Sequence, residues 1–208
     1  MVDVHIVGAG PGDPELITRK GYRLVQEADV VIYAGSLVNP AIYGAIQEQM
    51  DALAGMGISY EVVPGVSSFL ATAAALKQEY TLPNVSQTVI ITRMEGRTPM
   101  PPKEKLRMLA SHEATMCIFL SVQMLDKVVA ELIEGGYDKT TPVAIVVKAS
   151  WPDQRIIRGT LETIADIVAK EGVLRQAMIV VSHVLDSEYE LSKLYDKGFA
   201  HMYRSAKD

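Results

Sequence analysis

Residues 7–21 read VGAGPGDPELITRKG, and this stretch decides the fold class. Residues 2–7 are rich in valine and isoleucine and predict a buried strand. The glycines that follow predict a sharp turn at the end of this strand. Asp13 and Pro14 then provide an N-cap and a proline at the first helical position. A strand, a glycine turn and a helix in this order indicate an α/β protein, with residues 29–33 as the next strand of a parallel βαβ unit.

The pattern of the rest of the chain changes near residue 85. Before it, strands and helices alternate, which favours a mainly parallel sheet. After it, two predicted strands follow each other directly, which indicates a mixed sheet. We therefore expect an N-terminal αβα lobe over residues 1–85 and a C-terminal αβα lobe over residues 86–208. The expected strands cover residues 58–63, 89–93, 115–120, 143–148, 155–159 and 177–184, and the expected helices residues 14–26, 41–54, 66–77, 103–110, 122–134 and 161–170.

Composition excludes several functional classes. The chain has 208 residues, 49% of them hydrophobic, and a formal net charge of −5. Nucleic-acid-binding domains are usually basic, so this balance argues against that class. No apolar run reaches the roughly 20 residues of a membrane span, and the start of the chain lacks the features of a signal peptide. The single cysteine, Cys117, excludes a disulfide framework. We expect a cytoplasmic protein that does not bind membranes.

The first glycine turn is compatible with a bound ligand, because glycine lets the backbone approach closely. Its spacing is neither the dinucleotide fingerprint nor a phosphate loop. Pro11 also removes an N–H that a phosphate would need. A ligand here need not carry phosphate, and a strand-to-helix turn with no ligand is the open alternative.

Two later loops carry further polar candidates. Ser67 and Ser68 begin a predicted helix, where they could bind a ligand or simply cap the helix. Arg93 and Arg97 flank a glycine after a predicted strand, and arginine suits carboxylate recognition. A solvated, salt-bridged loop is the alternative there. Lys148, at the end of a predicted strand, and Arg155 nearby are further candidates for carboxylate recognition.

The remaining reactive residue types suggest no catalytic group. The four histidines have no metal-ligand spacing, so we expect no metal site, and only His112 is kept as a weak substrate contact. No serine has a histidine partner that the sequence can place, so acyl transfer has no support. Cys117 is expected to be an inert core thiol. We assign no catalytic residue.

These segments together resemble the tetrapyrrole methylase family, which are class III S-adenosylmethionine-dependent methyltransferases. The matching stretches are VGAGPGDPELITRKG, ADVVIYAGSL at 28–37, VVPGVSS at 62–68 and most of the C-terminal half. Four further stretches are similar to the branch that methylates precorrin-4 or cobalt-precorrin-4 at C11: residues 33–40, 86–101, 119–123 and 148–161.

The resemblance implies two αβα lobes with S-adenosylmethionine in the cleft between them, S-adenosylhomocysteine as product, an anionic tetrapyrrole as substrate and a homodimer. It implies C-methylation of a corrinoid precursor in cobalamin biosynthesis. By position, the cofactor contacts would be Pro11, Ile42, Ser67, Ser68, Phe119, Leu120, Ala149 and Ala177. The acidic arms of the substrate would meet Arg93, Arg97, Lys148 and Arg155.

One departure from the family pattern lies between Asn39 and Pro40. Relatives place a helix, a strand and a Gly-Asp turn there, whereas here the two flanking motifs run together. We expect that a segment is missing from the sequence at this point, because losing a strand would break the parallel crossovers of the N-terminal sheet. If the deletion is real, cofactor binding is in question.

Two alternatives stay open. The first is another enzyme of the same fold, such as a uroporphyrinogen-III or precorrin-2 methyltransferase, diphthine synthase or a ribosomal RNA methylase, although the acidic balance disfavours RNA. The second is a non-catalytic nucleotide-binding regulatory module. The arginine pair at 93 and 97 favours an enzyme.

Overall fold

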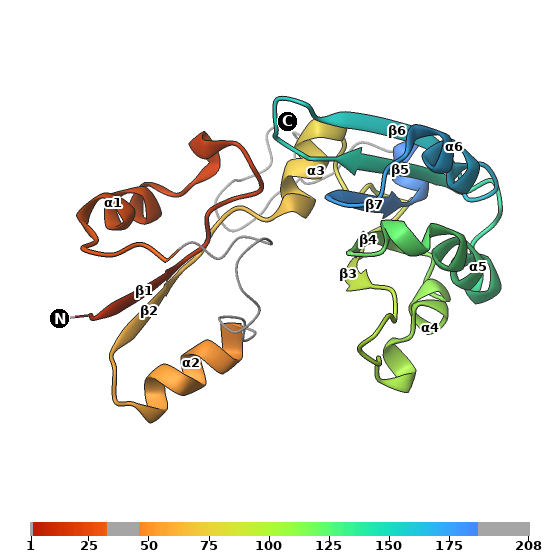
Figure 1. Ribbon diagram of the computed structural model, residues 1–208. Coiled ribbons are helices and arrows are strands. Elements are labelled where there is room, and N and C mark those ends of the chain that lie inside the picture. The colour runs from red at the N-terminus through yellow and green to blue at the C-terminus, as the bar shows by residue number, and fades with distance from the viewer. Residues whose placement is uncertain (1, 33–45, 187–208) are drawn as a thin grey trace, which may run out of the picture. The chain divides into compact units, whose positions relative to one another are not determined.

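The computed structural model describes residues 2–32 and 46–186, and the chain divides into two compact units, Met1–Ser68 and Phe69–Asp208 (Figure 1). The division falls before the boundary predicted at 85/86. The physical reason is that residues 69–85 supply apolar side chains, among them Ala71, Leu76 and Tyr80, to the core of the second unit.

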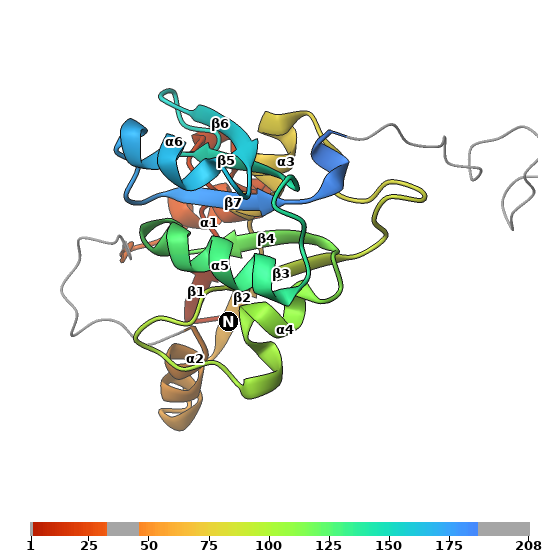
Figure 2. The same cartoon turned by 90° about the vertical axis from the view of Figure 1, so that its right-hand side faces the viewer.

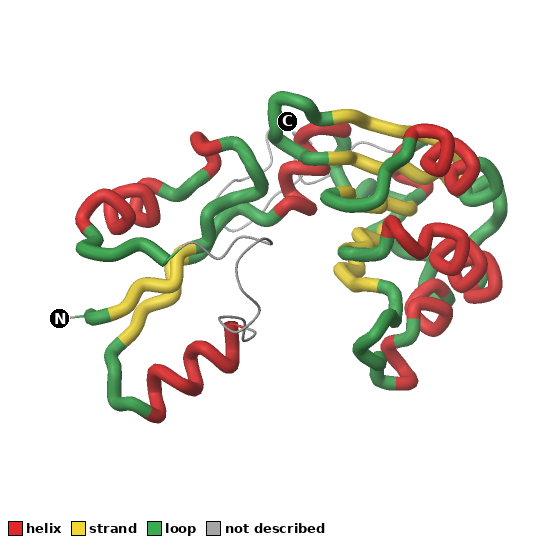
Figure 3. The backbone as a smooth tube through the Cα atoms, in the orientation of Figure 1, coloured by secondary structure: helices red, strands yellow, loops and turns green. Residues whose placement is uncertain are grey.

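Among its described residues, the first unit contains one short parallel strand pair, β1 (Val4–Val7) and β2 (Tyr60–Val63). The two strands lie side by side (Figure 3), and Val7 is the register partner of Val63. The predicted strands at 2–7 and 58–63 are thereby confirmed, each slightly shorter than expected. The unit also holds the helices α1 (Arg19–Glu27) and α2 (Ile46–Gly55).

The first predicted helix is split in two by a second N-cap. Asp13 caps a short 3₁₀ helix, η1 (Pro14–Leu16), and accepts a hydrogen bond from the Glu15 amide at 2.9 Å. The chain then extends at Ile17, and Thr18 caps α1 by accepting a bond from the Gly21 amide at 3.1 Å. A hydroxyl at an N-cap satisfies one of the amides that the first helical turn leaves free.

The strand predicted over residues 29–33 is wrong for its described part. Residues 29–32 belong to no strand, and Val30, Val31 and Ile32 are 77%, 57% and 77% exposed. A run of β-branched residues favours a strand only where a neighbouring strand supplies its hydrogen bonds. No such neighbour lies among the described residues of this unit, and Tyr33 is outside them.

The second unit is built on a five-stranded mixed sheet with the order β3-β4-β7-β5-β6 (Figures 1 and 2). Its strands are β3 (Val89–Arg93), β4 (Thr115–Phe119), β5 (Pro142–Val147), β6 (Arg155–Thr160) and β7 (Ala177–Val181). Among these five strands, β3 and β4 pair in parallel and the other neighbours pair antiparallel. The α/β fold with a parallel N-terminal sheet and a mixed C-terminal sheet is confirmed.

Helices cover both faces of this sheet (Figure 2). On one face lie α4 (Leu106–Ala110), α5 (Leu125–Gly135) and α6 (Ile164–Glu171), and α3 (Ser68–Leu76) lies on the other. Short 3₁₀ turns precede α4, precede α5 and follow β7. Gly135 permits the close packing of α5 on α4, because a Cβ there would lie 2.4 Å from the Arg107 carbonyl oxygen.

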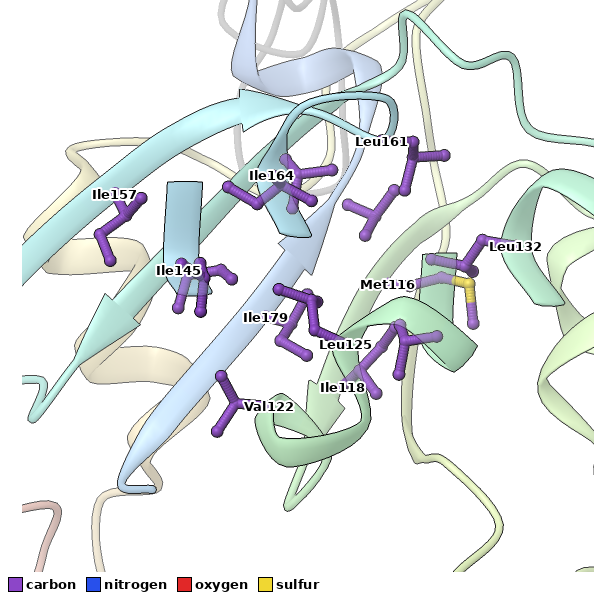
Figure 4. Close-up of a cluster of buried hydrophobic side chains, with 14 of the residues drawn as sticks. Met116, Ile118, Val122, Leu125, Leu132, Ile145, Ile157, Leu161, Ile164 and Ile179 are labelled. Carbon is purple, nitrogen blue, oxygen red and sulfur yellow. The ribbon is translucent and has the colours of Figure 1, made fainter. Parts of the chain in front are cut away.

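Two apolar clusters hold the second unit together. The larger one lies under α4, α5 and α6 and includes Met116, Ile118, Leu132, Ile145 and Ile179, which are at most 1% exposed (Figure 4). The smaller one contains Cys117, which is buried as expected. In the described ranges, no helix is long and apolar enough to cross a membrane.

Candidate cofactor and substrate site

The loop after β1 starts a first candidate binding edge in the first unit. The Gly8 amide donates to the Val63 carbonyl at 2.9 Å and extends the parallel pairing beyond β1. Gly10 follows with φ +87°, a conformation that glycine adopts readily. Pro11, a predicted cofactor contact, lies half-buried in the same loop. The loop is therefore at the carboxyl edge of the strands, where open α/β sheets bind ligands.

The loop after β2 meets it backbone to backbone. A Cβ on Gly8 would lie 2.6 Å from the Gly65 nitrogen, and a Cβ on Gly65 would lie 2.5 Å from the Gly8 oxygen. Neither position accepts a side chain without a backbone shift. Ser67 and Ser68 lie two and three residues after Gly65, and α3 begins at Ser68. The structure thus places the two predicted loops of this unit side by side.

In the second unit, one edge of the sheet gathers the other predicted cofactor residues. The strand β4 ends at Phe119 and β5 ends at Val147, while the antiparallel β7 starts between them at Ala177. Val147 is the register partner of Ala177, and the Lys148 amide donates to the Gln176 carbonyl at 2.7 Å. Leu120 is the first residue after β4 and Ala149 the second residue after β5, so the four residues predicted here lie at this edge.

The same edge concentrates backbone strain. Four of the seven non-glycine residues with positive φ in the described ranges lie on it: Leu120 (55°), Lys148 (50°), Ser150 (72°) and Gln176 (54°). Such conformations cost about 1–2 kcal/mol for an ordinary side chain. Leu120 is also 86% exposed, which is a second unfavourable feature for a leucine. Strain of this kind is typical of ligand sites.

The predicted substrate cations spread along this edge. Arg93 ends β3 and Arg155 starts β6, the two outer strands, so their backbones are about 19 Å apart at the usual strand spacing. Lys148 pairs with Asp153 and lies 5.9 Å from the centre of the Trp151 ring. Arg155 pairs with Glu171 at 3.1 Å. The Lys148 hydrogen bond and charge hold the pKa of Asp153 below its usual value.

The two arginines of the 92–99 stretch differ in their surroundings. The Arg93 guanidinium donates to the carbonyls of Met94 and Thr98 at 3.3 Å and of Pro99 at 3.5 Å. Arg97 is exposed and makes no ion pair with any residue in the described ranges. Of the four predicted cations, Arg97 has the guanidinium with the most donors available to a ligand.

Some site residues lie beyond the predictions or beyond the described ranges. Ile42, a predicted cofactor contact, is outside the described residues. Ser121 was not predicted, although it is fully buried and its hydroxyl accepts from the Met94 amide at 2.8 Å. Its place after a strand was the only available signal. In the part of the chain that the structure describes, no three acidic, histidine or cysteine side chains gather as a metal site.

Several proteins are similar in sequence to this chain over almost its whole length. A cobalt-precorrin-4 C(11)-methyltransferase of Methanocaldococcus jannaschii is 53% identical over 249 aligned positions, which cover 98% of this chain and 96% of that protein. A precorrin-4 C(11)-methyltransferase of Pseudomonas aeruginosa is 42% identical and covers 97% of this chain and 98% of its own.

Solved structures agree with these relatives. The X-ray structure of a cobalt precorrin-4 methyltransferase, a cobalamin biosynthetic enzyme, superposes with a TM-score of 0.82 at 41% identity, covering 88% of this chain and 96% of that one. A uroporphyrin-III C-methyl transferase from Thermus thermophilus, complexed with S-adenyl homocysteine, gives 0.70 at 26% identity, covering 88% and 93%. The model of the family "Tetrapyrrole (Corrin/Porphyrin) Methylases" matches residues 3–41 and 39–165, and this chain belongs to that family.

Proposed function

We propose that this protein transfers a methyl group from S-adenosylmethionine to C11 of cobalt-precorrin-4, or of metal-free precorrin-4, in cobalamin biosynthesis. The observation that carries the proposal is the 53% identity to the Methanocaldococcus jannaschii protein of that name, over 98% of this chain. The substrate-free fold alone would not separate this reaction from other methylations in the family.

The cofactor proposal is supported by the residues of both units. In the first unit, Gly8 and Gly65 let the two loops meet backbone to backbone, which brings the loops that carry Pro11, Ser67 and Ser68 side by side. In the second unit, exposed Leu120 offers an apolar contact, and buried Ala149 leaves little bulk after β5. Phe119, Ala177, Pro11, Ser67, Ser68 and Ile42 complete the proposed contact set.

The chemistry needs positioning more than a strong base. When bound, S-adenosylmethionine supplies an activated methyl group and a neutral leaving group. The acceptor is an electron-rich ring carbon of the tetrapyrrole, so this chain has to align the acceptor and exclude water. The acetate and propionate arms of the substrate would be held by the cations at the strained sheet edge, chiefly Arg97, Lys148 and Arg155, with Arg93 beside them.

We also propose that the protein carries a segment between Asn39 and Pro40 that this sequence lacks. Support comes from the family match, which breaks into two stretches that meet at residues 39–41, and from the alignment over 249 positions of a chain of 208 residues. The intact mass tests it: a mass near 22.7 kDa would contradict the proposal. In that case, we expect weak or absent cofactor binding.

The proposed assembly is a cytoplasmic homodimer with no nucleic-acid or membrane partner, which rests on the family resemblance. Light scattering coupled to size exclusion should give twice the chain mass. Cell fractionation should recover the protein in the cytosolic fraction. A single-chain mass at micromolar concentration would contradict the dimer.

The function is tested with methyl-labelled S-adenosylmethionine and enzymatically prepared precorrin-4, with and without cobalt. Mass spectrometry should find one added methyl, and fragmentation should place it at C11. Uroporphyrinogen-III and precorrin-2 serve as competing acceptors, and transfer to either of them alone would move the assignment within the family. Cofactor binding without transfer to any acceptor would favour the non-catalytic regulatory module.

A further inference from the structure

The loop Met94–Met100, between β3 and the turn before α4, is fastened at both ends by one side chain. The Arg93 guanidinium donates to the carbonyl of Met94 at the start of the loop and to those of Thr98 and Pro99 at its end. Arginine can bridge several acceptors in this way because its donors are spread over a rigid plane. The Arg93 guanidinium therefore donates to backbone carbonyls of the protein.

Glu95 adds a second fastening inside the loop. Its Oε1 accepts a hydrogen bond from the Met100 amide at 3.2 Å, and its Oε2 lies 3.5 Å from Lys105 Nζ. The half-buried Glu95 side chain therefore links the loop to the start of α4. A carboxylate at this position also neutralises Lys105, so the charge nearest the loop tip is that of Arg97.

Ser121 ties the loop to the strained sheet edge. Its hydroxyl accepts from the Met94 amide and donates to the Phe119 carbonyl, and the residue is fully buried. The loop is therefore joined to the end of β4, next to Leu120. At the loop tip, Gly96 has only the Met124 methyl within 4 Å of a would-be Cβ, so the chain there stands clear of its surroundings.

We infer that Arg93 and Glu95 are positioning residues and that Arg97, at the tip of the loop they fasten, is the residue that binds a carboxylate arm of the tetrapyrrole. The inference rests on the proposed function and assigns different roles to two neighbouring arginines. Arg97 is exposed and has no ion pair among the described residues, whereas the donors of Arg93 point to loop carbonyls.

Kinetics of four variants test the assignment in the full protein with saturating S-adenosylmethionine. Arg97→Ala should raise KM for the tetrapyrrole about tenfold with little change in kcat, as expected for one lost charge-assisted contact. Arg93→Ala should raise the same KM, and the double variant should do no more than Arg97→Ala alone. Arg107→Ala, which removes a surface arginine paired with Glu131, is the control and should change no KM.

The variant Arg93→Lys separates positioning from contact. Lysine keeps the charge and cannot bridge the carbonyls at both ends of the loop, so it should not restore KM. Restoration by lysine, or additive effects of Arg93→Ala and Arg97→Ala, would overturn the positioning role. An unchanged KM in Arg97→Ala would overturn the binding role.

A measurement without turnover keeps this inference separate from the proposed function. Hydrogen exchange of the peptide that covers residues 94–100 should quicken in Arg93→Ala and Glu95→Gln and stay unchanged in Arg97→Ala. If the wild-type protein methylates no tetrapyrrole, the proposed function fails, and the exchange result still decides whether Arg93 orders the loop. Unchanged exchange in Arg93→Ala would overturn that role.

Discussion

Gly8 and Gly65 touch through their backbones, with only 2.6 Å between the Gly65 nitrogen and the place where a Gly8 Cβ would stand. Gly8 is the first residue after β1 and Gly65 is the second residue after β2, so the contact sets how close the two candidate cofactor loops lie.

Replacement of Gly8 by alanine should separate the two loops. We expect S-adenosylmethionine binding to weaken by at least tenfold, because the new methyl group can be accommodated only by a backbone shift. Gly55→Ala is the matched control, since a Cβ there has nothing within 4 Å. Calorimetric titration of the cofactor checks both, and equal affinities for Gly8→Ala and wild type would contradict the role of the contact.

Replacement of Leu120 by glycine should have opposite effects on stability and binding. Glycine relieves the positive φ, so the free energy of unfolding should rise by up to about 1 kcal/mol. Loss of the exposed side chain should weaken S-adenosylmethionine binding by about fivefold if it packs on the cofactor. Leu174→Gly is the control, because Leu174 is also exposed and has no positive φ. Unchanged affinity in Leu120→Gly would remove Leu120 from the contact set.

High pH should destabilise the second unit. Burial raises the pKa of the Cys117 thiol to about 11 and also raises the pKa of the Tyr80 and Tyr137 hydroxyls. The folded state therefore keeps these protons while the unfolded state loses them, and stability falls as pH rises above about 9.

For Cys117 alone, we expect a loss of about 1 kcal/mol between pH 8 and pH 10. Guanidinium unfolding followed by circular dichroism at both pH values measures it. Cys117→Ala should reduce the pH dependence of the free energy of unfolding by that amount. An identical dependence in the variant would show that the thiol does not contribute to it.

The two units should differ in local stability. Among the described residues of the first unit, Val63 is the only large apolar side chain that is fully buried, whereas β4 and β7 are buried along nearly their whole length. Amides of β1 and β2 should therefore exchange faster than those of β4 and β7. Mass-resolved hydrogen exchange tests the difference. Equal protection in a protein of mass 22.7 kDa would mean that other contacts stabilise the first unit.

The sequence predicts the strands of the second unit better than those of the first. Strands such as Pro142–Val147 and Ala177–Val181 carry continuous apolar runs, which a sheet buried on both faces requires, and they begin within one residue of their predicted starts. Residues 30–32 carry the same composition and lie in no strand, because strand formation depends on a partner that a local pattern does not contain.

Helix starts and residues with positive φ are also hard to predict from the sequence. The helices α1 and α6 begin at Arg19 and Ile164, later than their predicted starts at residues 14 and 161. Thr18 caps α1 through its side chain, whereas Thr163 occupies the N-cap position of α6 without a side-chain cap bond. No local feature of Leu120 or Gln176 announces a positive φ, because their conformation is imposed by the strands that end and begin there. The part each predicted residue plays in binding depends on its neighbours, as the different surroundings of Arg93 and Arg97 illustrate.

The strand order of the second unit has a consequence for how the chain is made. β7 lies in the middle of the sheet and is the last in sequence of its five described strands. During synthesis, β3–β4 and β5–β6 can form as two separate pairs, and neither has its inner neighbour until Ala177–Val181 leaves the ribosome. The apolar edges of both pairs are open throughout that interval, which is when such edges associate wrongly. Insertion of β7 between β4 and β5 thus completes the sheet in one late step. A nascent chain stalled before Ala177 should be the form most dependent on chaperones.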